Sequence, residues 1–149
     1  MLKVLSTAIL VLGSANALAA GEGSLGLRCY SLPENEPLSI SLFYSEFEPG
    51  VYAPSYAEVL SNMTDVSQTC VTGPNRTGNE SGDLLQIVGA ANECGATEGS
   101  IVFNQLNEIE GTRQSTPEGD KFQGQFVYSH SSSGDGVVTL DCNILPISK

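Results

Sequence analysis

Large apolar residues recur at every second position in several short stretches of the chain. In residues 38–45 the apolar positions are Leu38, Ile40, Leu42 and Tyr44, and serine occupies most of the positions between them. This period of two is typical of a strand that buries one face. Further stretches of this kind, bounded by turn residues, cover residues 24–31, 64–72, 84–91, 100–109, 122–130 and 136–145. The pattern predicts an all-β protein of about seven antiparallel strands, a small sandwich or barrel.

Segments rich in turn residues separate these stretches. Residues 73–82, GPNRTGNESG, are predicted to form a long polar loop, and residues 131–136, SSSGDG, a hairpin tip. One segment favours a helix, residues 54–62, PSYAEVLSN. A proline is tolerated in a first helical turn, and the apolar residues that follow it fit a short amphipathic piece. We therefore expect at most one short helix.

The first 19 residues have the three regions of a secretory signal peptide. Lys3 supplies the charge, residues 4–12 are apolar, and Ala17-Leu18-Ala19 is a small-residue cleavage site. We expect the mature chain to form a single β domain over residues 20–149, periplasmic or extracellular, and the short leader favours a bacterial source. In a eukaryote, its three Asn-x-Ser/Thr sites would be glycosylation candidates. The leader is too short to span a bilayer and no later apolar run is longer, so no membrane span is expected.

Four cysteines in a secreted chain predict two disulfides. Cys29 and Cys142 share the apolar faces of the first and last predicted strands. This favours a bond between them, and a second bond between Cys70 and Cys94 that closes the long polar loop. The alternative is sequential, Cys29 with Cys70 and Cys94 with Cys142. Because the chain has no C-x-x-C motif and a single histidine, His130, we expect no metal and no other cofactor.

The chain is strongly acidic. It has 17 acidic and 6 basic residues, a net charge of -11. Removal of Lys3 with the leader would leave five basic residues. Nucleic acid is a poor partner for such a chain, because phosphate binding depends on clustered lysine and arginine. The acidic residues are scattered along the sequence, which favours a role in solubility.

No motif indicates an enzyme. The G-x-G-x-x-G at residues 21–26 lacks the preceding strand of a dinucleotide site, and His130 lies beside a serine-rich tip where a solvated, dispensable histidine is expected. The leading hypothesis is a non-catalytic secreted or periplasmic protein that binds a protein or surface partner through loops. Two alternatives remain open: a lipocalin-like carrier of a small apolar ligand, and a small carboxylate-based hydrolase.

Candidate partner-binding residues lie in two polar loops and one aromatic segment. The loops, residues 73–82 and 111–121, hold Arg76, Arg113 and Lys121. Arginine is over-represented among interface hot spots. The most specific form of the loop-binding hypothesis is a protease inhibitor that presents Arg76 or Arg113 to a trypsin-like enzyme. In the segment EFEPGVY, residues 46–52, an exposed Phe47 or Tyr52 would be an anchor.

Overall fold

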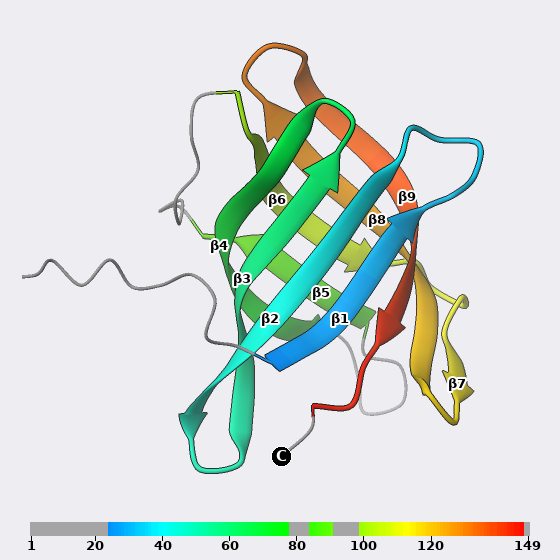
Figure 1. Ribbon diagram of the computed structural model, residues 1–149. Helices are drawn as coiled ribbons and strands as arrows, with labels where there is room; N and C mark the ends of the chain where they lie inside the picture. Colours follow the sequence, from blue (N-terminus) through cyan, green and yellow to red (C-terminus); the bar gives the residue numbers. More distant parts are fainter. Residues whose placement is uncertain (1–23, 78–83, 91–98, 148–149) are drawn as a thin grey trace, which may run out of the picture.

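The chain folds into a closed antiparallel barrel of eight strands with one short additional strand (Figure 1). The computed structural model describes residues 24–77, 84–90 and 99–147, without the side chains of residues 73–77. No helix occurs in this described part. The strands are β1 (Ser24–Ser31), β2 (Leu38–Glu48), β3 (Val51–Ser61), β4 (Thr64–Thr77), β5 (Leu84–Gly89), β6 (Ile101–Glu108), β7 (Gln114–Thr116), β8 (Gly119–His130) and β9 (Gly134–Ile144).

Strands that follow one another in the sequence are neighbours around most of the barrel. β1 to β6 pair in order, and the pairings of β6 with β8 and of β9 with β1 close the ring. β7 pairs with Gly119–Lys121, the first residues of β8, and extends the sheet beyond the ring as a small hairpin. Closure removes the exposed edges that an open sheet would present. The predicted fold class, an all-β sandwich or barrel, is confirmed, and the structure is a barrel.

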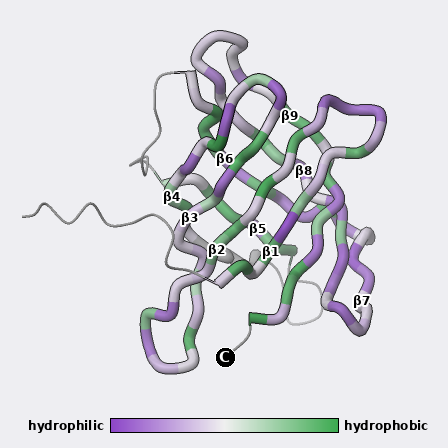
Figure 2. Tube along the Cα trace, in the orientation of Figure 1, coloured by the Kyte–Doolittle hydropathy of each residue, from purple (hydrophilic) through white to green (hydrophobic). Residues whose placement is uncertain are grey.

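The barrel interior is filled by apolar side chains. Leu38, Ile40 and Leu42 are buried, as their alternation in the sequence predicts. Phe103 and Phe126 are fully buried, with ring centroids 5.1 Å apart. An eight-stranded barrel is just wide enough for side chains to fill it. Figure 2 shows the same division along the chain, with hydrophobic positions along the strands and a hydrophilic connection between β1 and β2.

A disulfide joins the first and last strands of the barrel. Cys29 and Cys142 are direct partners in the register of β1 and β9, their Cα atoms are 4.0 Å apart, and both residues are buried. This confirms the favoured pairing and shows that the sequential one is wrong. Cys94 lies outside the described residues, so the bond between Cys70 and Cys94, and with it the count of two disulfides, stays a prediction.

The predicted helix at residues 54–62 is wrong, because residues 54–61 belong to strand β3 and Asn62 lies in the turn that follows. Ala57 and Val59 are fully buried opposite Leu42 and Ile40. Pro54 lies at an irregularity in the register of β2 and β3, where a strand tolerates a residue without a backbone N–H. Pairing on both sides, with β2 and β4, outweighs the weak local preference for a helix.

Part of the predicted polar loop at residues 73–82 is also strand. β4 continues to Thr77, and Asn75, Arg76 and Thr77 pair with residues 84–86 of β5. Residues 78–83 lie outside the described residues. The short strand β7 was not predicted either.

The connections gather at the two ends of the barrel. In the view of Figure 1, the upper end carries the β1–β2 connection (residues 32–37), the β3–β4 turn and the β8–β9 turn (residues 131–133). The lower end carries the β2–β3 hairpin, which projects beyond the barrel, and the β7–β8 hairpin.

Candidate functional site

Arg113, a predicted partner-binding residue, is held in an ion pair. Its Nε donates to Glu108 Oε1 at 2.8 Å and its Nη2 to Glu108 Oε2 at 2.5 Å. Nη1 donates to Asp120 Oδ2 at 3.3 Å. The Glu108 side chain is 2% exposed and also accepts a hydrogen bond from the backbone N–H of Leu85 at 2.8 Å. The guanidinium lies 5.7 Å from the centroid of the Phe122 ring. These contacts give Arg113 a structural role in the described protein.

The ion pair shifts the pKa values of both partners. Burial by itself would raise the pKa of Glu108, but the hydrogen bonds from Arg113 and Leu85 and the attraction of the guanidinium together lower it. The hydrogen bond to Glu108 raises the pKa of Arg113 against the opposing effect of burial. Both groups are therefore charged at neutral pH.

The other predicted partner-binding residues lie on separate elements. Phe47 is 65% exposed near the tip of the β2–β3 hairpin, whereas Tyr52 is half-buried opposite Glu46. Lys121 is exposed at the start of β8. The side chain of Arg76 lies outside the described residues. The structure does not bring these residues together into one site.

The prediction of a solvated His130 is wrong. β8 continues to this residue, its side chain faces the core, and it is 8% exposed. Its Nδ1 accepts hydrogen bonds from the backbone N–H groups of Ser132 and Ser133, each at 3.2 Å, while its Nε2 is buried without a partner in the described structure. His130 therefore organises the β8–β9 turn.

A group of exposed apolar side chains lies at the upper end of the barrel. This group was not identified from the sequence. Of the seven large hydrophobic residues that are exposed in the described part of the chain, five gather there. We call them the upper apolar face: Tyr30 (51% exposed), Leu60 (50%), Met63 (42%), Val66 (55%) and Val137 (61%).

Strand register places three of these side chains in one row. Tyr30 on β1 pairs with Ser39 on β2, Ser39 pairs with Leu60 on β3, and Leu60 pairs with Val66 on β4. The small Ser39 side chain leaves a hollow of about 450 Å³ that Tyr30 and Leu60 both line. Only the pairing of strands distant in sequence brings these residues into line, so the sequence could not show it.

A second hollow extends the upper apolar face toward β9. Its volume is about 250 Å³, and Pro37, Met63 and Val137 line it. Pro37 and Leu38 line both hollows, so the surface is continuous from Val66 to Val137. Exposed acidic residues border it, namely Glu34, Glu36, Asp65 and Asp135.

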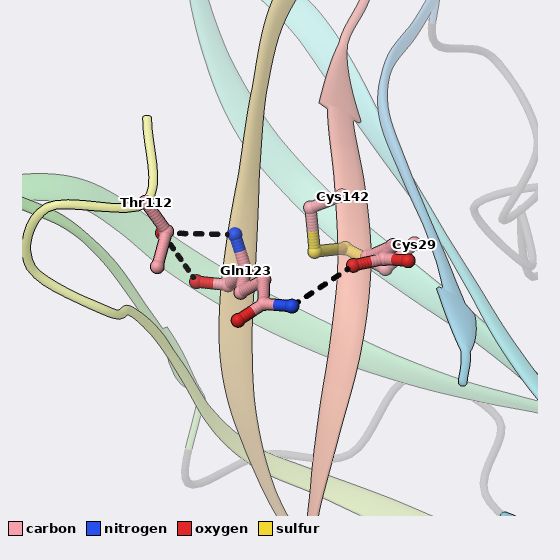
Figure 3. The surroundings of a disulfide bond; sticks show 5 residues. Cys29, Thr112, Gln123 and Cys142 are labelled. Carbon is pink, nitrogen blue, oxygen red and sulfur yellow. Dashed lines mark hydrogen bonds between the residues drawn. A yellow bond between two sulfur atoms is a disulfide. The ribbon is translucent and has the colours of Figure 1, made fainter. Parts of the chain in front are cut away.

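A larger hollow, which we call the lateral groove, lies on the outer face of β1, β9 and β8. Its volume is about 510 Å³, and Arg28, Lys121 and Asn143 line it together with Thr112 from the segment between β6 and β7. Figure 3 shows how Thr112 is held: its Oγ1 accepts from the backbone N–H of Gln123 at 3.0 Å. The disulfide lies beside this contact, and Cys142 lines the groove.

Comparison of the chain with protein-family models, with curated proteins and with solved structures finds no match. Among the described residues, no helix is long and apolar enough to cross a membrane. No group of three or more His, Cys, Asp or Glu side chains in that part of the chain is placed to hold a metal ion.

Proposed function

We propose that this protein is a non-catalytic binding protein of the periplasm or the extracellular space, and that a protein partner contacts its upper apolar face. The observation that carries the proposal is the concentration of five exposed apolar side chains on one continuous surface. Contiguous exposed apolar patches on soluble proteins mark interaction sites, because each such side chain costs free energy while it faces water.

The barrel is suited to this role as a scaffold. Its interior is filled by side chains such as Phe103 and Phe126, which supports binding on the outer surface rather than inside the barrel. A disulfide between the terminal strands is compatible with an oxidising compartment. The hydrolase alternative has less support, because both oxygens of Glu108, the one buried carboxylate of the described residues, are occupied by hydrogen bonds.

The charge around the face indicates the chemistry of the partner. Four exposed charged side chains near it are acidic, namely Glu34, Glu36, Asp65 and Asp135, and Arg28 lies beside Tyr30 at one margin of the face. Interfaces combine an apolar centre with a charged rim, and complementary rims speed association and reject other partners. We therefore propose a partner whose apolar patch is bordered by lysine or arginine. The contact then runs mainly over a sheet face, not over the loops at residues 73–82 and 111–121.

Two double variants of the tagged protein test the proposal. Leu60→Ser with Val66→Ser removes two neighbouring apolar side chains of the face. Phe47→Ser with Val51→Ser removes the exposed apolar residues of the β2–β3 hairpin at the other end of the barrel. Partners captured from the secreted fraction are quantified by mass spectrometry. We expect the first pair to reduce capture of a specific partner at least about tenfold, equivalent to roughly 1.4 kcal/mol, and the second to leave it unchanged. The opposite order would place the contact on the hairpin and refute the proposal.

A further inference from the structure

We infer that the lateral groove is a separate site that binds a small molecule through a carboxylate group. The groove has a volume of about 510 Å³. Small-molecule sites in proteins span roughly 300–1,000 Å³, so the groove is large enough for a ligand of several to a few tens of non-hydrogen atoms. The groove shares Tyr30 with the upper apolar face, but Arg28, Lys121 and Asn143 lie outside that face. The test of the groove therefore does not depend on the proposed protein interface.

Two cationic side chains flank the centre of the groove. In the strand register, Asn143 on β9 pairs with Arg28 on β1 and with Lys121 on β8. Neighbouring strands lie about 4.8 Å apart, so the Cα atoms of Arg28 and Lys121 are about 10 Å apart on the same outer face. Both side chains line the groove and are long enough to contact one anion above Asn143.

Neither cation is neutralised by the protein. The two ion pairs among the described residues both belong to Arg113. Asp120, the sequence neighbour of Lys121, is occupied by Arg113 and by the hydroxyl of Ser115. Arg28 and Lys121 are therefore the two unpaired cations whose side chains the structure describes, and a chain of net charge -11 holds them in one groove. This arrangement selects an anionic group locally against an acidic background.

The neighbouring polar groups favour a carboxylate that also carries hydrogen-bond donors. The Asn143 side chain lines the groove with its Oδ1 buried and unpartnered, which leaves its amide nitrogen as the donor for a ligand. Asp141 lies two residues along the same face, about 7 Å away, and accepts from Gln123 Nε2 at 3.5 Å. A ligand hydroxyl or ammonium group fits beside Asp141 while the carboxylate lies between Arg28 and Lys121.

The experiment is an NMR titration of the ¹⁵N-labelled protein, with its disulfide intact, at neutral pH and low salt. The probes are D-glucuronate, which has a carboxylate and several hydroxyls, and its neutral amide, D-glucuronamide. We expect saturable shifts of backbone amides in β1, β8 and β9 with a Kd of about 1 mM or lower for glucuronate, and binding at least about tenfold weaker for the amide. Added salt should weaken the binding, because exposed charges are screened.

Variants connect the binding to the two cations. Arg28→Gln and Lys121→Gln should each weaken glucuronate binding at least about tenfold. Asn35→Asp, at the upper end of the barrel, changes the net charge by the same amount and should leave binding unchanged. The inference is overturned if glucuronate produces no saturable shifts in these strands, if the amide binds equally well, or if both cation variants bind as the unmodified protein does.

Discussion

Replacement of Arg113 by methionine isolates the energetic role of the ion pair at the lower end of the barrel. Methionine keeps an unbranched apolar side chain at this position and removes the guanidinium. Glu108 then loses the hydrogen bonds to both of its oxygens from Arg113 and keeps the one from the backbone of Leu85. Because the Glu108 side chain is 2% exposed, water cannot replace the lost donors without local opening.

The structure sets limits on the size of the effect. A buried carboxylate that loses its partner can become neutral by taking up a proton, which removes the free-energy cost of an unpaired buried charge. From the ordinary pKa of 4.5, protonation at pH 7 costs about 3.4 kcal/mol, at 1.36 kcal/mol per pH unit. Breaking a buried ion pair typically costs 3–5 kcal/mol, and the partial exposure of Arg113 reduces this. We expect Arg113→Met to lower the free energy of unfolding by about 2–4 kcal/mol at pH 7.

The effect should depend on pH with a definite sign. The pKa of Glu108 is lowered in the folded protein, so the ion pair contributes its full stability above the unfolded pKa and loses it as the pH falls through the lower, folded pKa. In the variant, burial without the guanidinium raises the pKa of Glu108 instead. The deficit of Arg113→Met is therefore largest near neutral pH. It begins to shrink above pH 4.5, as the pH falls through the raised pKa of Glu108 in the variant, and shrinks further through the lowered pKa of Glu108 in the unmodified protein.

Urea unfolding monitored by circular dichroism, between acidic and neutral pH, measures the deficit. The double variant Glu108→Gln with Arg113→Met is the control, because it removes the buried charge as well as its partner. It should be more stable than Arg113→Met alone at pH 7, with a coupling energy of about 1–3 kcal/mol. A loss below about 1 kcal/mol in Arg113→Met, or a deficit independent of pH, would refute the structural role assigned to this pair.

Three further substitutions test the fold in the same unfolding assay. Cys29→Ala with Cys142→Ala removes a disulfide between residues 113 positions apart and should lower the free energy of unfolding by about 2–5 kcal/mol. A double variant as stable as the unmodified protein would contradict the pairing. Gly119→Ala should lower the free energy of unfolding by about 1–3 kcal/mol, because Gly119 has a φ of +121° and an added Cβ would lie 2.0 Å from the carbonyl oxygen of Ile144. An unchanged unfolding midpoint would show that Gly119 does not pack against Ile144. His130→Ala removes the acceptor for two backbone N–H groups and should cost about 1–2 kcal/mol, whereas the sequence alone predicted no effect.

Strands with a regular alternation of apolar and polar residues were predictable, because a strand that buries one face has an apolar residue at every second position. β1 was predicted with its observed bounds, and the inward positions of β2 followed from Leu38, Ile40 and Leu42. β3 was missed because its sequence has a proline and no clean alternation, and its strand state depends on pairing with β2 and β4. Pairing with β5 likewise decides the end of β4.

The candidate sites could not be predicted because they are made by register between distant strands. Arg28 and Lys121 are 93 positions apart in the sequence and become neighbours of Asn143 through β9. Tyr30, Leu60 and Val66 likewise meet across four strands. Arg113 was predicted as a partner-binding residue, whereas the structure pairs it with Glu108. Glu108 gave no signal, since a buried carboxylate looks like any other acidic residue in a sequence.

Site-specific photo-crosslinking shows whether a protein partner contacts the upper apolar face. A photoreactive phenylalanine analogue is placed at Val66, in the row with Leu60 and Tyr30, and in a second preparation at Val51 on the β2–β3 hairpin. Both positions are exposed, so neither replacement disturbs the core. After irradiation in the producing cells or their secreted fraction, we predict a discrete covalent adduct with one protein from position 66 and none from position 51. An adduct from position 51 alone, or no adduct from position 66, would show that the upper apolar face does not bind a protein partner.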